Sequence, residues 1–279
     1  MNELFYKSAN YIIKEPLLMN ACITAYDISK ANINVLFAYD KITEPEYYKL
    51  YTLDKKSREI AIGRKISSAF PSLAPLSEEE VDYKTELIKT IQTGIGEAKR
   101  LLIQMNDIKE EEIVRIANDA VYINRPVPLN FTTFDLNKNG RPITFIDKGQ
   151  YNILLNLNKV SLFINDNPLS EQFEIDVIGI NNDNLDKHRL FISFIIEMLS
   201  SLQKGNKELV LSTFNSFYND YLNMNLPVDY YREFNADSGY RILNAGYIID
   251  DISELEKNKI NIEYNLSLLR QLYSIIMEY

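Results

Sequence analysis

The order of β-prone and helical stretches along the chain limits its fold more than any other property of the sequence. Residues 21–26 (ACITAY) form a β-prone run that ends at Asp27, and apolar residues then recur at helical spacing over residues 29–39. Helical patterns continue, the longest from residue 77 to about 105, before a second β-prone stretch at residues 113–123. The sequence therefore predicts an α+β fold in which mostly helices separate two early strand regions.

Two shorter helices are expected between these strand regions. The first covers residues 43–53, with Thr43 as N-cap and Pro45 in the first turn, and the second covers residues 55–69. Residues 70–75 (FPSLAP) interrupt the helical pattern.

The second half of the chain mixes strands and helices again. Four β-rich runs, ITFI, YNILLNL, VSLFI and FEIDVIGI, are separated by residues that favour turns. Later elements are predicted as helices at about 186–203 and 207–223, β-like portions at 228–234 and 240–243, and a terminal helix at 263–278. We expect two regions: residues 1–139, and an α+β region of unknown role over residues 140–279.

Composition limits the class of protein. Of the 279 residues, 46% are hydrophobic and 25% are charged, which are values typical of a globular protein and not of a disordered chain. A single cysteine, Cys22, excludes an internal disulfide. The start of the chain lacks a signal-peptide pattern, and no apolar run is long enough to cross a bilayer. We therefore expect a cytoplasmic protein without a membrane partner.

The charge balance bears on possible partners. The chain has 30 Lys plus Arg against 39 Asp plus Glu, a formal charge of −9, so its mean field repels phosphate. A nucleic-acid partner would need a local basic groove, and we expect a protein partner to supply part of it. The many Ile, Asn, Lys and Tyr residues with no Trp are typical of AT-rich coding sequences, as in a low-GC bacterium or its phage. For a phage protein, the expected location is the host cytoplasm.

Asp27 and Asp119 are the strongest candidates for chemistry. Asp27 closes a β-prone run before a helix, and Asp119 lies at the turn of a predicted hairpin. Nucleotidyl transfer by a two-metal mechanism needs carboxylates held rigidly close together, and neighbouring strands can provide this. The structural alternative is that Asp27 is a helix N-cap and Asp119 an ordinary turn residue.

The surroundings of both aspartates resemble family A DNA polymerases. The stretch from Asp27 to Leu36 (DISKANINVL) resembles motif A, and the stretch from Arg115 to Ile123 (RIANDAVYI) is similar to motif C. The resemblance implies an antiparallel palm-like sheet with inserted helices over residues 1–139. It also implies that Asp27 and Asp119 are catalytic residues that bind Mg²⁺ or Mn²⁺.

A basic helical face lies between the two motifs. Lys55, Arg58 and Lys65 recur at helical spacing, and the motif B helix of the family stands at the same place in the order of motifs. The resemblance implies that these residues bind a nucleoside triphosphate, whose charge needs neutralising opposite the metals. Asn32 stands where motif A has the Glu that helps exclude a ribose 2′-hydroxyl, so it is expected to contact substrate.

The sequence also departs from the family pattern. Asn34 replaces the motif A Arg, and Asn118 and Ala120 replace the His and Glu of motif C. Our first hypothesis is a divergent, template-dependent, palm-type nucleotidyltransferase, an enzyme whose partners are nucleic acid and a nucleoside triphosphate. The alternatives are a catalytically silent palm-like subunit that binds nucleic acid or regulates a phage complex, and a phage structural or assembly protein.

Other candidate sites have simpler explanations. His188, the only histidine, lies at a predicted helix start without a partner pattern. The glycines of residues 93–97 (TGIGE) are expected to allow close helix packing and not to bind phosphate. The acidic runs at residues 110–112 and 250–251 are expected to be solvated. The aromatic residues of 228–234 are expected to belong to an edge strand.

Overall fold

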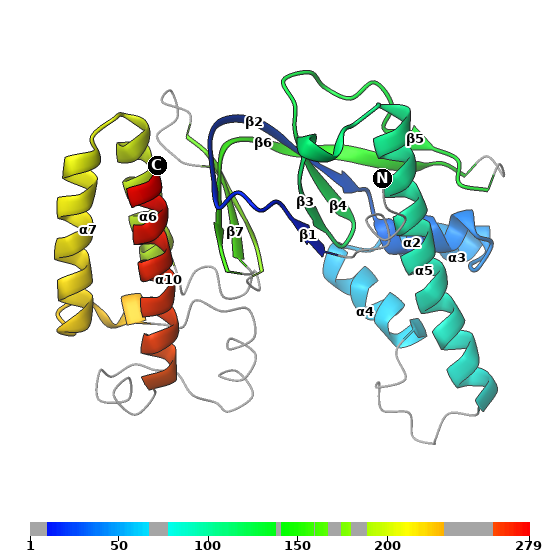
Figure 1. The fold of residues 1–279 in the computed structure, drawn as a ribbon. Helices are drawn as coiled ribbons and strands as arrows, with labels where there is room; N and C mark the ends of the chain where they lie inside the picture. Colours follow the sequence, from blue (N-terminus) through cyan, green and yellow to red (C-terminus); the bar gives the residue numbers. More distant parts are fainter. Residues whose placement is uncertain are drawn as a thin grey trace. The chain divides into compact units, whose positions relative to one another are not determined.

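The structure is a computed structural model of the 279-residue chain. It describes residues 10–66, 78–137, 141–158, 160–166, 174–179, 189–231 and 259–279. The chain forms two compact units (Figure 1). Unit 1 comprises Met1–Ile13 and Cys22–Gln150, and unit 2 comprises Lys14–Ala21 and Tyr151–Tyr279. The first strands and helices are β1 (Asn10–Ile12), β2 (Leu17–Ile28), α2 (Ala31–Ala38), α3 (Glu44–Tyr51), α4 (Lys55–Ile66) and α5 (Glu78–Met105).

The remaining elements continue the mixture of strands and helices. They are η1 (Glu110–Glu112), β3 (Ile113–Ala117), β4 (Ala120–Asn124), β5 (Thr133–Phe134), β6 (Ile143–Leu157), β7 (Val160–Asn165), β8 (Glu174–Ile178), α6 (Arg189–Gln203), α7 (Lys207–Leu222), η3 (Val228–Tyr231) and α10 (Lys259–Glu278). The predicted α+β class is confirmed.

An antiparallel sheet forms the centre of unit 1. Its strands follow the order β1, β3, β4, β2 and β6, and the short strand β5 pairs with β6. Strands β3 and β4 form the predicted hairpin, and β4 pairs with β2 from Ile23↔Asn124 to Asp27↔Ala120. This pairing places the end of β2 beside the tip of the hairpin.

Helices α2 and α5 cover one face of this sheet (Figure 1). Their apolar side chains share a buried cluster with the strands, including Val35 of α2, Leu102 of α5, Tyr26 of β2 and Val121 of β4. A second buried cluster joins the other sides of α2 and α5 to α3 and α4. The sheet and both pairs of helices are therefore held together by burial of apolar surface.

Gly94 lies where α5 crosses closest to α2. A Cβ atom at this position would lie 2.3 Å from Val35 Cγ1 and 3.0 Å from Tyr39 Cε2. The predicted close helix packing in the TGIGE segment is thus confirmed at Gly94, which is buried inside α5.

We expect Gly94→Ala to destabilise the protein. Overpacking costs about 1–3 kcal/mol, which outweighs the gain of about 0.8–1.0 kcal/mol that alanine brings to a helix interior. The expected net loss in free energy of unfolding is up to about 2 kcal/mol, measured by chemical denaturation. Gln92→Ala, at an exposed position of the same helix, is the control and should not be destabilising. A Gly94→Ala protein as stable as wild type would contradict this packing.

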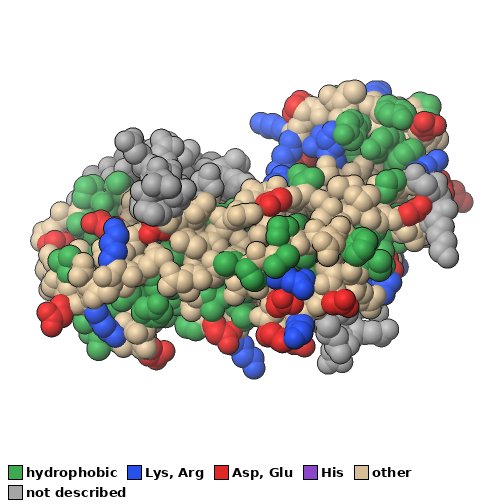
Figure 2. Space-filling view, turned by 90° about the horizontal axis from the view of Figure 1, so that it is seen from above, with side chains coloured by type: hydrophobic (Ala, Val, Ile, Leu, Met, Phe, Trp, Pro, Cys, Tyr) green, Lys and Arg blue, Asp and Glu red, His purple; other side chains and the backbone are tan. Residues whose placement is uncertain are grey.

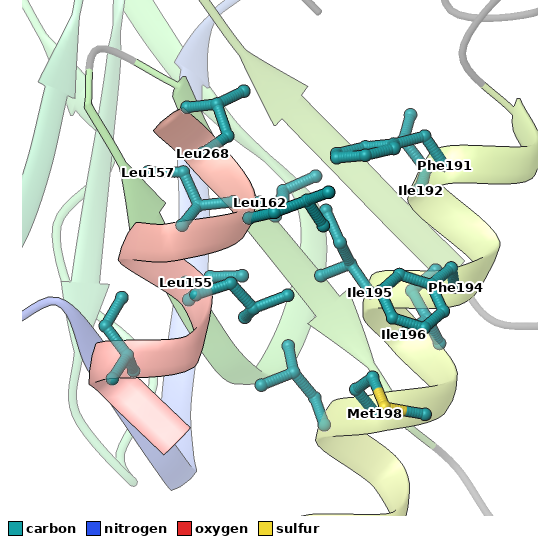
Figure 3. Packing of buried hydrophobic residues seen from close by; sticks show 14 of the residues in the cluster. Leu155, Leu157, Leu162, Phe191, Ile192, Phe194, Ile195, Ile196, Met198 and Leu268 are labelled. Atoms are coloured by element: carbon teal, nitrogen blue, oxygen red, sulfur yellow. The ribbon is translucent and has the colours of Figure 1, made fainter. Parts of the chain in front are cut away.

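Unit 2 has its own core of strands and helices. In Figure 3, Leu155 and Leu157 of β6 and Leu162 of β7 share a cluster with side chains of α6 and with Leu268 of α10. Aromatic rings extend the cluster towards α7, where the rings of Phe194 and Phe217 stack with centroids 3.7 Å apart. Unit 2 therefore has a hydrophobic cluster of its own.

Most predicted elements are confirmed, and the differences have local causes. The runs ITFI and YNILLNL belong to one continuous strand, β6, because the polar residues between them stay extended. Thr43 is the N-cap of α3, but its side chain makes no capping hydrogen bond. The predicted strand at 228–234 is wrong over Val228–Tyr231, which forms the 3₁₀ helix η3, and Tyr231 is fully buried there. The predicted break at 70–75 and the β-like portion at 240–243 lie outside the described residues.

Among the described residues, no helix combines the length and the apolar character that crossing a membrane requires.

Candidate active site

Pairing of β2 with β4 brings Asp27 and Asp119 together. Asp27 stands opposite Ala120 in the ladder, and the backbone N–H of Ile28 donates to the carbonyl oxygen of Asp119 at 3.1 Å. Two aspartates that are far apart in the sequence therefore occupy neighbouring positions at one end of the sheet.

Asp27 belongs to the strand and does not cap the helix that follows. Helix α2 begins at Ala31, and its N-cap is Lys30. Tyr26 and Ile28 both point into the core beneath the helices. Because successive side chains of a strand point to opposite faces, Asp27 lies on the face of the sheet away from α2 and α5.

Asp119 occupies the two-residue turn of the hairpin, as predicted. Ala117 pairs with Ala120, and Asn118 adopts a left-handed backbone conformation with φ of 46°. Asparagine tolerates this conformation better than most residues. Asp119 itself is half-buried. A tight turn of this kind holds the backbone of Asp119 in a fixed position.

Lys148 of β6 pairs with Asp27. Its Nζ lies 3.3 Å from Asp27 Oδ2, and the side chains of Lys148 and Asp27 are 51% and 25% exposed. Ile143 and Phe145 of the same strand are buried in the core, whereas Ile146 and Lys148 are exposed. Lys148 therefore lies on the same face of the sheet as Asp27.

Burial and charge together raise the pKa of Asp27 above its ordinary value of 3.8. Partial burial is the largest cause, because it disfavours the charged form, and the negative charge of Asp119 is the next. The positive charges of Lys148 and Lys55 act in the opposite direction. The negative charge of Asp119 therefore acts on the Asp27 carboxyl, and a cation shared by the two stays a prediction.

We predict that the charges of Asp119 and Lys148 both shift the pKa of Asp27. In ¹³C NMR titrations, Asp119→Asn should lower the pKa of Asp27, because it removes a like charge, and Lys148→Met should raise it, because it removes a favourable one. The midpoint for Asp27 in wild type should lie above 3.8. An Asp27 midpoint that does not move in Asp119→Asn would show that the two carboxylates are too far apart to share an ion.

The buried side chain of Lys99 in α5 stabilises the turn of the β3–β4 hairpin. It is only 3% exposed, and its Nζ donates to the carbonyl oxygen of Asn118 at 2.9 Å. Burial lowers the pKa of Lys99 from 10.5 to about 8, and the negative charge of Asp119 opposes this shift. The Lys99 side chain therefore fixes the turn that carries Asp119.

Lys55 of α4 interacts electrostatically with Asp27. It is 79% exposed, lies 4.0 Å from Glu59 one turn along α4, and favours the charged form of Asp27. An exposed pair at this distance is weak, and the predicted contact of Lys55 with a triphosphate stays a prediction.

The other two predicted phosphate-binding residues of α4, Arg58 and Lys65, have partners within the protein. Arg58 Nη1 donates to the carbonyl oxygen of Leu53 at 3.0 Å, and Lys65 Nζ lies 2.6 Å from Glu46 Oε1. Ile62, on the same helical face, is buried. This face of α4 therefore packs partly on the helices of unit 1, and the roles of Arg58 and Lys65 in binding triphosphate stay predictions.

The asparagines that replace motif A residues lie at the start of α2. Asn32 is half-buried in the first turn, and its contact with substrate stays a prediction. Asn34 donates to the Ser29 carbonyl oxygen at 2.5 Å and accepts a hydrogen bond from the Tyr47 hydroxyl at 2.9 Å. Asn34 therefore links α2 to α3 and has a structural role where the family has a cationic side chain.

Lys99 and Lys148 were not among the residues predicted for the site, although the sequence around each of them contains an indication of its position. Lys99 follows Ile95 and precedes Ile103 at a spacing of four along α5, so a lysine interrupts a line of apolar residues. A lysine on the buried side of a helix needs a polar partner. Lys148 gave a weaker signal, because it lies in the polar stretch between two β-rich runs that were assigned to separate strands.

Among the described residues, the remaining acidic candidates do not form a metal-binding group. Residues 110–112 form the 3₁₀ helix η1, and Glu112 Oε1 lies 3.3 Å from Arg125 Nε. His188 and residues 250–251 lie outside the described residues. Within the described ranges, no three His, Cys, Asp or Glu side chains gather as a metal-binding group. The candidate site therefore consists of two carboxylates with nearby lysines.

Figure 2 shows basic side chains interspersed with acidic ones on the face in view, without one continuous basic surface. This distribution agrees with the formal charge of −9. The protein partner expected to complete a nucleic-acid groove stays a prediction.

Comparison with known proteins gives a phage family for this chain. No curated protein matches the sequence. The profile of one family, described as the Bacteriophage PBS1 gene 130 protein, matches residues 1–278 and supports the phage origin predicted from residue composition. That description names no activity, so the resemblance to family A polymerases stays a prediction. Because the match covers almost the whole sequence, the chain belongs to the Bacteriophage PBS1 gene 130 protein family.

Proposed function

We propose that this phage protein is a divergent palm-type nucleotidyltransferase that extends a nucleic acid with Mg²⁺ or Mn²⁺. The observation that carries the proposal is the convergence of Asp27 and Asp119, which the β2–β4 pairing places side by side. Asp27 lies on the face of an antiparallel sheet opposite its helices, and two lysines are near it.

The two carboxylates fit the donor set of a magnesium site. Mg²⁺ prefers oxygen ligands, keeps several waters and is commonly bound by one or two carboxylates together with substrate phosphates. Asp27 and Asp119 are both half-buried, so each side chain is partly accessible to a hydrated cation. A site of only two protein carboxylates therefore needs the nucleotide to complete it.

The proposed reaction is attack of a strand's terminal hydroxyl on the α-phosphorus of a nucleoside triphosphate. The new P–O bond forms as the bond to the β-phosphate oxygen breaks, pyrophosphate leaves, and the hydroxyl proton passes to solvent. A bound divalent cation would stabilise charge on the phosphate oxygens and activate the hydroxyl.

In this proposal the chain's own residues position the cation and neutralise the charge of the triphosphate. Asp27 and Asp119 hold the cation, and the hairpin turn fixed by Lys99 limits the movement of Asp119. Lys55 and Lys148 offer ammonium groups near Asp27 that can neutralise the triphosphate.

A catalytically silent palm-like subunit is the second candidate. It is favoured by the residues around Asp119, because Asn118 and Ala120 stand where motif C of the family has His and Glu. A protein of this kind would bind nucleic acid or regulate a phage complex without extending a strand.

Primer extension separates the two candidates. Purified protein is incubated with DNA or RNA primer–template pairs, nucleoside triphosphates and either Mg²⁺ or Mn²⁺, and binding of the same primer–template is measured by fluorescence anisotropy. Extension that requires the cation supports the enzyme. Binding without extension under every template and cation condition would exclude the enzyme and support the silent subunit. Neither binding nor extension would leave the structural or assembly role.

A further inference from the structure

Lys148 occupies the position beside Asp27 where a divalent cation would bring positive charge. Its Nζ lies 3.3 Å from Asp27 Oδ2, and half of its side chain is exposed. It comes from β6, a different strand from either aspartate. The lysine is therefore held by the sheet on the same face as the carboxylate.

We propose that Lys148 is an internal substitute for the metal, which neutralises Asp27 before loading and transfers to the triphosphate when the cation binds. This inference rests on the proposed function, because it assigns a role to Lys148 at the same site.

The charges around Asp27 support an exchange of Lys148 for a divalent cation. Without a metal, Asp27 interacts with the ammonium groups of Lys148 and Lys55, and Asp119 interacts with the buried Lys99. A divalent cation by itself neutralises both carboxylates and leaves the two lysines without their counter-charge at Asp27. The released ammonium groups then lie beside the position where the phosphates coordinate the same ion. Lys148 and Lys55 thus offset carboxylate charge before loading and part of the triphosphate charge after it.

The exposure of the Lys148 and Asp27 side chains supports a reversible release of Lys148 from Asp27. An ion pair in which one partner is 51% exposed and the other 25% exposed is strongly screened by water. Such pairs contribute little to stability, so a doubly charged ion can displace the lysine from Asp27. The flexible four-carbon stem of lysine lets the ammonium move to a nearby phosphate while the strand stays in place.

A purely structural ion pair makes a different prediction. If Lys148 only tethered β6 to β2, removing its charge would change stability and leave cation binding unaffected. The exchange model instead predicts opposite effects on two ligands, since Lys148 competes with the cation and assists the triphosphate.

The test measures Mn²⁺ binding by electron paramagnetic resonance on the full chain, without nucleotide. Lys148→Met should tighten Mn²⁺ binding by about two- to fivefold, the effect of removing one exposed ionic competitor. Lys148→Arg, which keeps the charge, should bind Mn²⁺ within about twofold of wild type. Lys204→Met, at an exposed position in unit 2, is the matched control and should leave Mn²⁺ affinity unchanged.

A second measurement determines the affinity for the triphosphate. With saturating Mn²⁺, Lys148→Met should weaken binding of a nucleoside triphosphate by roughly tenfold, because a charge-assisted contact is lost. Tighter Mn²⁺ binding together with weaker triphosphate binding supports the exchange.

The outcomes separate this inference from the proposed function. If wild type binds Mn²⁺ through Asp27, as shown by loss of binding in Asp27→Asn, and Lys148→Met leaves both affinities unchanged, the exchange is overturned while the enzyme proposal stands. If wild type binds no Mn²⁺ with or without triphosphate, both are overturned.

Discussion

Asp27→Asn should lower the rate of nucleotide incorporation by about 10²–10⁴-fold, because a metal-bound transition state loses several kcal/mol of stabilisation when a ligand is removed. Asparagine keeps the size of the side chain, so the β2–β4 ladder should persist. The expected loss is therefore in the rate and not in folding, and it is measured by single-turnover primer extension together with circular dichroism.

Asp119→Asn should have an effect of similar size, and the double variant should be little worse than either single one. Residues that hold one ion act as a unit, so their effects do not add. Asp82→Asn, on the exposed first part of α5, is the matched control and should keep wild-type activity. Full activity in either active-site variant would rule out a shared catalytic ion.

Phe194→Ala should cause the largest loss of stability, about 3–5 kcal/mol. Phe194 is 7% exposed, its ring stacks on Phe217 with centroids 3.7 Å apart, and it also lies against Phe214. Removing the ring takes away buried apolar surface and leaves a cavity between α6 and α7. The effect should appear as a lower denaturation midpoint for unit 2.

Phe131→Ala provides the comparison for this substitution. Phe131 is 50% exposed, so removing its ring should cost much less free energy. If unit 2 contributes no groups to the candidate site, Phe194→Ala should also leave Mn²⁺ binding intact at temperatures where unit 2 stays folded. Equal destabilisation by the two substitutions would contradict the assigned core.

The early part of the fold was predictable because its sequence signals are local. A β-prone run followed by helical spacing predicts β2 and α2, and a pair of turn-forming residues between apolar halves predicts the β3–β4 hairpin. The residue bias indicated a phage origin, and the family match supports it. These predictions depend on neighbours in the sequence, so one sequence was sufficient.

The composition of the candidate site was harder to predict, because its electrostatics depend on contacts between distant segments. Lys148 lies in a polar stretch between two β-rich runs, and nothing local shows that the strand continues through it to meet Asp27. The basic face of α4 shows the opposite problem. Helical spacing groups Lys55 with Lys65, but only the tertiary structure shows that Glu46 binds Lys65.

The 3₁₀ helix η3 was mispredicted for a related reason. Its tyrosines favour a strand locally, yet the Tyr231 ring is buried against Tyr221 of α7, with centroids 4.7 Å apart. Burial of a large ring against a helix overrides the local preference. The β-propensity of these residues predicts a strand, but their packing determines the backbone conformation of η3.

The division of β2 between the two units has a consequence for synthesis of the protein on the ribosome. Residues 14–21 belong to unit 2, where Leu17 and Met19 pack on the core and the Pro16 carbonyl accepts a hydrogen bond from the Asn156 N–H at 2.8 Å. These residues emerge long before their partners are translated. The apolar residues of this segment therefore stay exposed in the nascent chain until the rest of unit 2 is translated. In a protein truncated after Gln150 they would remain exposed.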